Sequence, residues 1–176
     1  RYELGFDGAG PILVAGSTHH GEEEILADAL RKILLQFPAA KLLVAPRDIL
    51  RSGKVVTLFQ RHGFAAELRS KSEANSACPV SVVVLDTIGE LGRVYSLADL
   101  VFVGGSLVDH GGHNILEPAA YGKPILVGPH MFNFKDTHAL FSGRKACATV
   151  IDGPALMDKA LELLHEDGLI QKHHGK

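Results

Sequence analysis

The sequence predicts an α/β fold with a doubly wound parallel sheet of the Rossmann-like kind. Apolar runs of strand length recur along the chain, and each is followed by turn residues and then by a stretch of helical period. These runs are continuously apolar, which is typical of parallel strands covered by helices on both faces. A chain of 176 residues with 46% hydrophobic content is long enough for one substantial core. We therefore expect one domain over residues 1–176.

The first half of the chain shows this order most clearly. Residues 11–15 form an apolar run, and residues 22–37 carry apolar side chains on one helical face as far as Pro38, which ends the helix. The elements expected next are a strand at 41–45, a helix at about 52–62 closed by Gly63, a short strand at 65–69, a surface loop at 71–79 and a strand at 80–85.

The second half repeats the order around a glycine-rich stretch. The expected elements are a helix at 89–98, strands at 100–103 and 124–127, a helix from about Asn114 between them, a helix at 135–142, a strand at 148–151 and a helix at 154–165. Ligands of such folds bind at the carboxyl ends of the strands. The loops expected to matter are therefore 16–21, 46–52, 86–90, 104–113 and 128–133.

Composition excludes several classes of protein. The chain has 18 basic and 20 acidic residues, and a net charge of -2 argues against a binder of nucleic acid that works by massed phosphate contacts. Two cysteines are too few for a disulfide framework or a cysteine zinc site, which fits a reducing compartment. No apolar run is long enough to span a membrane, and no signal peptide is visible. Because residue 1 is Arg, we expect a fragment whose missing N-terminal part contributes to any active site.

The glycine-rich stretch is typical of a site for an anionic ligand. Gly104 and Gly105 follow an apolar strand, and Asn114 stands where a helical pattern begins. Amides in the first turn of a helix lack partners within the helix and lie at the positive end of its dipole, so they favour a phosphate. Asn114 and Glu117, three residues apart, share a face of this helix. Their structural alternatives, an N-cap and a first-turn acid, are compatible with ligand binding, and Glu117 could also accept two ribose hydroxyls.

Polar side chains in the first and later loops are candidates for the wall of the pocket. Ser17, Thr18 and His19 are interpreted as neutral donors bordering it, and His113 joins them from the glycine-rich stretch. A metal site at His19 and His20 is disfavoured, since no pattern such as HExxH supplies further ligands.

The second loop offers a cation. Arg47 directly follows a strand, and its planar fork suits a phosphate or a carboxylate. The alternative is a surface arginine paired with Asp48 or Asp86.

Several catalytic signatures are absent from the sequence. The sequence lacks the G-x-S-x-G elbow of serine hydrolases and the Walker loop of P-loop enzymes. It also lacks a G-x-G-x-x-G motif after the first strand, which would indicate NAD binding.

A family resemblance rests on the stretch GGSLVDHGGHNILEPAAYGKPILVGPHMFNF, which resembles the signature of the 3-deoxy-D-manno-octulosonic acid (Kdo) transferases. The segments GSTHHGEEE, LVAPRD and TIGELGRVYSLADLVFVGGS match the same family in the same order, so the resemblance covers about residues 11–165. It implies the C-terminal half of a two-domain GT-B glycosyltransferase that binds CMP-Kdo. It also implies that a lipid A precursor, the acceptor, is bound mainly by an N-terminal domain outside this chain.

The resemblance also implies roles for particular residues. Arg47 and the glycine loop Gly104, Gly105 and Ser106 would face the CMP, Asn114 and Glu117 would hold phosphate and ribose, and Ile88, Gly89 and Glu90 would lie near the base. Asp48 stands where the family more usually has His, so a contact of this side chain is not carried over. An acid near a phosphate would repel it unless it were turned away or paired with Arg47.

The implied reaction is inverting glycosyl transfer, without a metal or a cofactor. Its general base would be a carboxylate of the N-terminal domain, so no catalytic residue is expected in this chain, and the isolated fragment is expected to be inactive. The resemblance places the whole enzyme peripherally on the cytoplasmic face of the bacterial inner membrane. Two alternatives stay open: the donor domain of another GT-B transferase or epimerase that uses a UDP-sugar, and a non-catalytic α/β binding module.

Overall fold

The sheet is parallel throughout, as the continuous apolar runs predict. The structure, a computed structural model, describes residue 6 and residues 10–72 and 80–173. Within these residues seven strands form one sheet in the order β3-β4-β2-β1-β5-β6-β7, with every neighbouring pair parallel. The strands are β1 (Ile12–Thr18), β2 (Lys41–Pro46), β3 (Ala66–Leu68), β4 (Val82–Val84), β5 (Leu100–Val103), β6 (Ile125–Val127) and β7 (Ala148–Thr149).

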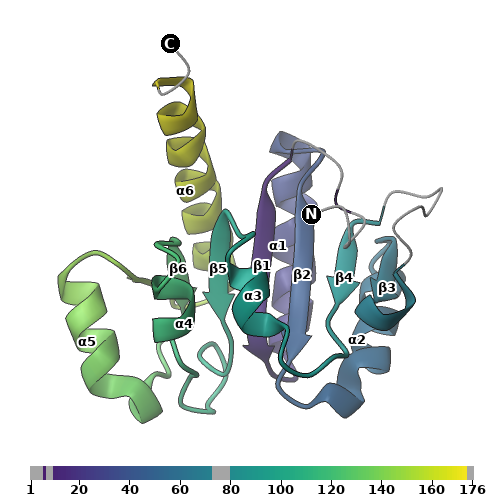
Figure 1. Cartoon of the computed structure of the whole chain (residues 1–176), viewed down its shortest axis with the longest axis horizontal. Helices are drawn as coiled ribbons and strands as arrows, with labels where there is room; N and C mark the ends of the chain where they lie inside the picture. The colour runs from purple at the N-terminus through teal and green to yellow at the C-terminus, as the bar shows by residue number, and fades with distance from the viewer. Residues whose placement is uncertain (1–5, 7–9, 73–79, 174–176) are drawn as a thin grey trace.

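Helices cover both faces of this sheet (Figure 1). They are α1 (Glu22–Gln36), α2 (Ser52–Arg61), α3 (Leu91–Tyr95), α4 (Leu116–Ala119), α5 (Lys135–Gly143) and α6 (Gly153–His173), with 3₁₀ turns η2 (Ile49–Arg51), η3 (Arg69–Lys71) and η4 (Phe132–Phe134). One core layer packs α1, α2 and α6 on the sheet, and the other packs α3 and the segments around α4 and α5 on the opposite face. The doubly wound α/β prediction is confirmed.

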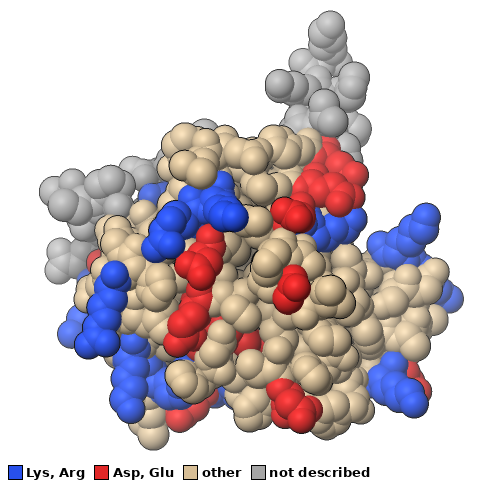
Figure 2. All heavy atoms as spheres, turned by 180° about the vertical axis from the view of Figure 1, so that it is seen from behind, with Lys and Arg blue, Asp and Glu red and all other residues tan. Residues whose placement is uncertain are grey.

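Burial accounts for the positions of the strands. Each residue of β4 and β5 is buried, so these strands read as continuous apolar runs. Helix α1 instead buries one face, including Leu26, Leu30 and Ile33, against the sheet. Figure 2 shows the molecule from the side on which α1 covers the sheet. Acidic and basic side chains lie side by side on this surface, and neither sign covers it. The surface therefore agrees with the small net charge.

The chain reverses its direction of winding at β1. The first crossovers lead from β1 to β2 and beyond, whereas β5 returns to pair with the other edge of β1. The carboxyl ends of β1 and β5 thus flank the switch point where ligands of such sheets bind. At this end β1 contains a register shift around Ser17, whose φ of 55° is positive.

Several predicted boundaries need correction. The helix expected at 89–98 covers only Leu91–Tyr95, because Ser96, Leu97 and Ala98 bond three residues back instead of four. The helix expected from Asn114 begins at Leu116 and is one turn long. The strand expected at 148–151 ends at Thr149, and the helix expected at 154–165 extends over Gly153–His173. Most of the loop expected at 71–79 lies outside the described residues.

Candidate functional site

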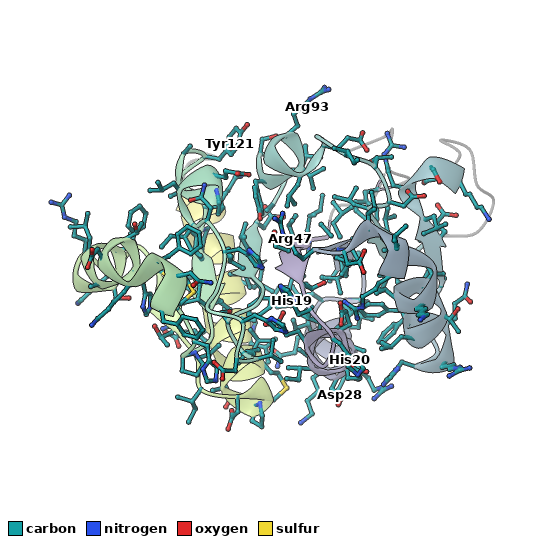
Figure 3. The ribbon with its side chains drawn as sticks, turned by 90° about the horizontal axis from the view of Figure 1, so that it is seen from below. His19, His20, Asp28, Arg47, Arg93 and Tyr121 are labelled. Atoms are coloured by element: carbon teal, nitrogen blue, oxygen red, sulfur yellow. The ribbon has the colours of Figure 1, made fainter. Side chains whose placement is uncertain are left out.

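The candidate site lies on the carboxyl edge of the sheet, at the switch point between β1 and β5. Figure 3 looks onto this edge and shows Arg47 and His19 near its centre, whereas Arg93 and Tyr121 lie at its margin on the α3 and α4 side. The site is therefore assembled from the loops that follow β1, β2, β4 and β5.

The glycine loop that follows β5 is hydrogen-bonded to a buried glutamate side chain of the same chain, that of Glu22. The carboxylate of Glu22 is completely buried and accepts hydrogen bonds from the backbone N–H groups of Gly105 (2.8 Å), Ser106 (3.1 Å) and Leu107 (3.0 Å). It also accepts one from the N–H of His19, at 2.9 Å. Burial raises the pKa of Glu22, and the four backbone donors act in the opposite direction. These loop amides are thus already paired with a side chain of the chain itself.

Other members of the predicted pocket also have their polar groups turned inward. Ser106 is completely buried; its hydroxyl donates to the Val103 carbonyl and accepts from the Gly128 N–H. Thr18 is completely buried as well, and its hydroxyl donates to Glu23. The structure therefore places both side chains inside the protein, where they hold loops together, instead of on the wall of a pocket.

Gly104 and Gly105 fill positions that larger residues could not. A Cβ on Gly104 would lie 2.5 Å from the carbonyl oxygen of Ser17, because the irregular end of β1 packs directly on this backbone. Gly105 has a φ of +67°, and a Cβ there would lie 3.0 Å from the ring of His113. Both glycines therefore permit close packing at the switch point.

Three histidines cover the outer side of the glycine loop. The Nε2 atoms of His19 and His113 are 2.8 Å apart, so one ring donates to the other, and His110 stacks on His19 with ring centroids 4.0 Å apart. Burial, then His19 and then Arg47, lower the pKa of His113 from 6.5 to about 4, and burial followed by His110 lowers the pKa of His19. The pair is therefore neutral near neutral pH and presents hydrogen-bonding groups without a cationic charge of its own.

Arg47 supplies the positive charge next to this pair. Its backbone N–H donates to the Thr18 carbonyl, and its side chain is exposed. Among the described residues its guanidinium makes no ion pair or hydrogen bond. Asp48 instead accepts from the N–H of Leu50, and Asp86 accepts from Ser70, so the alternative pairing of Arg47 with either acid is not formed. The carboxylate of Asp48 thus caps its own turn.

The loop after β4 contains an exposed apolar side chain, Ile88, and an acidic side chain, Glu90, which is held by neighbouring residues. Ile88 is 91% exposed although it is a large aliphatic residue, and it precedes Gly89, whose φ of +85° forms the turn. Glu90 accepts from the hydroxyl of Thr87 and lies 3.7 Å from Arg69. Ile88 is therefore the group of this loop that is open to a ligand.

Asn114 and Glu117 belong to the segment around α4, and a Cβ on Gly92 at the start of α3 would lie 3.9 Å from the Glu117 carboxylate. The Oδ1 atom of Asn114 accepts from the Leu116 N–H at 2.9 Å, and the amide nitrogen of Asn114 takes no part in this bond. Glu117 is exposed on α4, and its charge adds to burial in raising the pKa of Tyr95. The hydroxyl of Tyr95 lies against Gly16, where a Cβ would be 1.9 Å away. Glu117 consequently faces the carboxyl end of β1 across Tyr95.

Sequence reasoning missed the two buried acids at the start of α1. Glu22 and Glu23 are both 0% exposed, and Glu23 receives two hydrogen bonds of 3.1 Å from Arg51. Three consecutive acids fit a helix dipole, which accounts for them without any further partner. The available signal was their position directly after a strand end, at the same sheet edge as a glycine loop rich in N–H donors.

No group of three or more His, Cys, Asp or Glu side chains in the described part of the chain is arranged to hold a metal ion. No helix of the described chain combines the length and apolar character needed to cross a bilayer.

Comparison with known proteins first identifies the architecture. A putative UDP-N-acetylglucosamine 2-epimerase from Listeria monocytogenes matches with a TM-score of 0.58 at 12% identity, over 95% of this chain and 39% of that one. An O-GlcNAc transferase from Thermobaculum terrenum matches with a TM-score of 0.58 at 14% identity, over 94% of this chain and 30% of that one. At these identities the matches show the fold alone. They share the parallel α/β sheet of this chain.

Closer relatives then identify the family, although no protein-family model matches the chain. The 3-deoxy-D-manno-octulosonic acid transferase of Haemophilus influenzae is 37% identical over 88% of this chain, and that of Bordetella pertussis is 33% identical over 89%. The C-terminal CMP-Kdo binding domain of WaaA from Acinetobacter baumannii has a TM-score of 0.85 at 30% identity, over 97% of this chain and 88% of that domain. The chain belongs to the Kdo transferase family. It spans 36% and 37% of the length of the first two relatives.

Proposed function

We propose that residues 1–176 are the donor-binding domain of an enzyme that transfers Kdo from CMP-Kdo to a lipid A precursor. The similarity to a domain described as CMP-Kdo binding, at 30% identity over 97% of this chain, supports the donor. The names of the curated relatives support the reaction. The acceptor is proposed to bind mainly to an N-terminal domain of the whole enzyme.

The observation that carries this proposal is the exposed Arg47 beside two neutral histidines at the switch point. A nucleotide phosphate is favoured by a cation and hydrogen-bond donors, and an unpaired carboxylate in contact with it would repel it. Arg47 has no partner in the described chain, and Asp48 is bonded to Leu50. His19 and His113 lie close enough to Arg47 for its charge to lower the pKa of both. We assign the donor phosphate to this group.

The nucleoside is assigned to the loop after β4 and to the segment around α4. The exposed Ile88 offers an apolar surface for the base, and Gly89 and Glu90 shape its turn. The carboxylate of Glu117, near the start of α3, is exposed for ribose hydroxyls, and Asn114 lies in the turn before α4. The backbone of Gly104, Gly105 and Ser106 supports this arrangement from beneath, with the amides of Gly105 and Ser106 bonded to Glu22.

The proposed reaction inverts the configuration at the anomeric carbon of Kdo. An acceptor hydroxyl attacks this carbon, the bond to the phosphate oxygen breaks, and CMP departs with the bonding electron pair. Arg47 stabilises the negative charge that develops on the leaving phosphate. The hydroxyl proton passes to a general base on the N-terminal domain, so this chain alone is proposed to transfer no Kdo. No metal or cofactor takes part.

The whole enzyme is proposed to act peripherally at the cytoplasmic face of the bacterial inner membrane, where a lipid A precursor is available. This assignment follows from the acceptor, since the acceptor is a lipid. No role for nucleic acid is proposed, in agreement with the net charge of -2.

Calorimetric titration of the chain with CMP and with UDP tests the donor. We expect CMP to bind and UDP to bind more weakly. A preference for UDP would instead indicate a GT-B transferase or epimerase that uses a UDP-sugar, and no binding of either nucleotide would favour a non-catalytic α/β module. Measurable Kdo transfer by the chain without an added N-terminal domain would contradict the proposed location of the base.

A further inference from the structure

Glu22 holds two loops of the site at once. Its carboxylate accepts from the N–H of His19 in the loop after β1, and from three successive N–H groups, those of Gly105, Ser106 and Leu107, in the loop after β5. The side chain is 0% exposed, so water does not compete for these bonds.

A carboxylate suits this position better than any uncharged side chain. Two carboxylate oxygens offer about four acceptor positions and no donor, which matches the four N–H groups. A glutamine offers one oxygen, and its amide N–H groups would point at backbone donors. Replacing Glu22 by glutamine therefore leaves at least one loop amide without an acceptor in a buried place.

Both histidines that face Arg47 depend on these bonds. His19 is bound to Glu22 through its own backbone N–H. The ring of His113 packs on Gly105, and the Gly112 N–H donates to the Gly105 carbonyl at 2.8 Å, so the position of His113 follows that of Gly105. The 2.8 Å contact between the two rings thus requires both loops to be held in place.

We propose that Glu22 is a positioning residue of the donor site, which binds the glycine loop from inside and so fixes His19 and His113 side by side for the donor phosphate. The role assigned to the two rings rests on the proposed function. The hold on the loop does not, because it is a property of the free protein.

The neighbouring Glu23 provides a matched comparison. It is also a glutamate of the first helical turn and also 0% exposed, but its carboxylate accepts from Arg51 and Thr18 and from no amide of the glycine loop. Glu22→Gln and Glu23→Gln therefore remove the same charge from adjacent buried places, and only the first should release the loop.

The test measures amide hydrogen exchange by NMR in the nucleotide-free wild type, Glu22→Gln and Glu23→Gln. We expect exchange at Gly105, Ser106 and Leu107 to become about tenfold faster or more in Glu22→Gln, because a hydrogen bond to a charged group is lost. We expect Glu23→Gln to keep the wild-type rates there. In Glu22→Gln the pKa of His113 should also return from about 4 towards 6.5, because release of the loop exposes the ring to water and separates it from His19.

A CMP titration of the folded proteins completes the test. We expect Glu22→Gln to bind CMP about tenfold more weakly. Ile33→Val, which trims the core under α1 away from the site, should lower the melting temperature and keep the affinity. If Glu22→Gln does not fold, Glu22→Asp, one methylene shorter, is measured in its place with the same expected directions. Unchanged exchange at the three amides overturns the proposal, as does CMP affinity that falls equally in Glu22→Gln and Ile33→Val. A wild type that does not bind CMP refutes the proposed function alone, since the exchange result still decides the hold on the loop.

Discussion

The two sides of the carboxyl edge differ in how their polar groups are satisfied. On the β5 side, the amides of Gly105 and Ser106 are bonded to the buried Glu22, and the Ser106 hydroxyl is bonded on both of its sides. On the β2 and β4 side, Arg47 has no partner in the described chain, and Ile88 is 91% exposed.

This difference distinguishes a scaffold side, whose polar groups hold the site together, from a recognition side, whose exposed groups can contact a ligand. A loop whose buried donors are all paired gains nothing from a ligand at those donors, since the desolvation cost has already been offset by Glu22. An exposed cation and an exposed aliphatic side chain, in contrast, can exchange water for a ligand. We therefore expect changes at the buried contacts of the glycine loop to act first on stability, and on affinity only through the histidines that the loop positions. Changes on the β2 and β4 side should act on affinity alone.

The largest effect should follow Gly104→Ala, on the scaffold side. Its Cβ would lie 2.5 Å from the Ser17 carbonyl oxygen and 2.6 Å from the Thr18 Cα, and these backbone atoms have little room to move. Overpacking of this kind should lower the free energy of unfolding by about 3 kcal/mol, measured by urea denaturation. The control is Gly53→Ala in α2, where a Cβ meets nothing within 4 Å. Equal stability of the two variants would mean that the close approach at Gly104 is absent.

The next effect should follow Arg47→Ala, on the recognition side. Loss of a charge-assisted contact to the phosphate should weaken CMP binding about 10- to 100-fold and leave the melting temperature unchanged. Arg93→Ala is the matched control, because Arg93 lies at the margin of the same edge (Figure 3). The distinction between the two sides fails if both variants bind CMP like the wild type.

A third effect is a dependence of stability on pH. The pKa of His113 is about 4 in the folded state and 6.5 ordinarily, so between these pH values the unfolded chain binds more protons. Unfolding at pH 5.5 should therefore take up about one additional proton from this residue, and the free energy of unfolding should fall as the pH is lowered from 7 to 5.5. His113→Gln should make this fall shallower, and His20→Gln should keep it. Parallel curves for the wild type and His113→Gln would show that the ring is not desolvated.

The smallest effect should follow Ile88→Ser. Removal of an apolar contact with the base should weaken CMP binding about fivefold. Stability should not change, because the side chain is already exposed. Leu35→Ser, at an 81% exposed position near the end of α1, serves as the control for a surface substitution. Equal CMP affinity of these two variants would place the base elsewhere.

The sheet could be predicted well from the sequence because its strands are buried on both faces. Runs such as β5 are apolar at each position, and this pattern is typical of a central parallel strand. The short helices were harder to predict. Around α4 the chain passes from bonds four residues back, as at Ala119 and Ala120, to bonds three residues back at Tyr121 and Gly122, and apolar spacing does not report this change.

The candidate site was predictable only where it is local. Arg47 could be selected because it directly follows a strand, and the structure leaves it exposed. The part of Glu22 could not be read from local pattern, since its partners at Gly105 and Leu107 lie 83 and 85 residues further along the chain. Ser106 and Thr18 are placed at the pocket by the sequence pattern but are buried in the structure. Their burial depends on contacts with Gly128 and Glu23, which the pattern of the sequence does not reveal.

The most direct measurement of this division is a CMP titration followed by NMR of the wild-type chain. We predict that CMP shifts the side-chain signals of Arg47 and His113 and leaves amide exchange at Gly105 and Ser106 at its nucleotide-free rate, because these amides are already bonded to Glu22. Strong new protection of the two amides, with unmoved signals from Arg47 and His113, would contradict it and return the glycine loop to the role of phosphate binder.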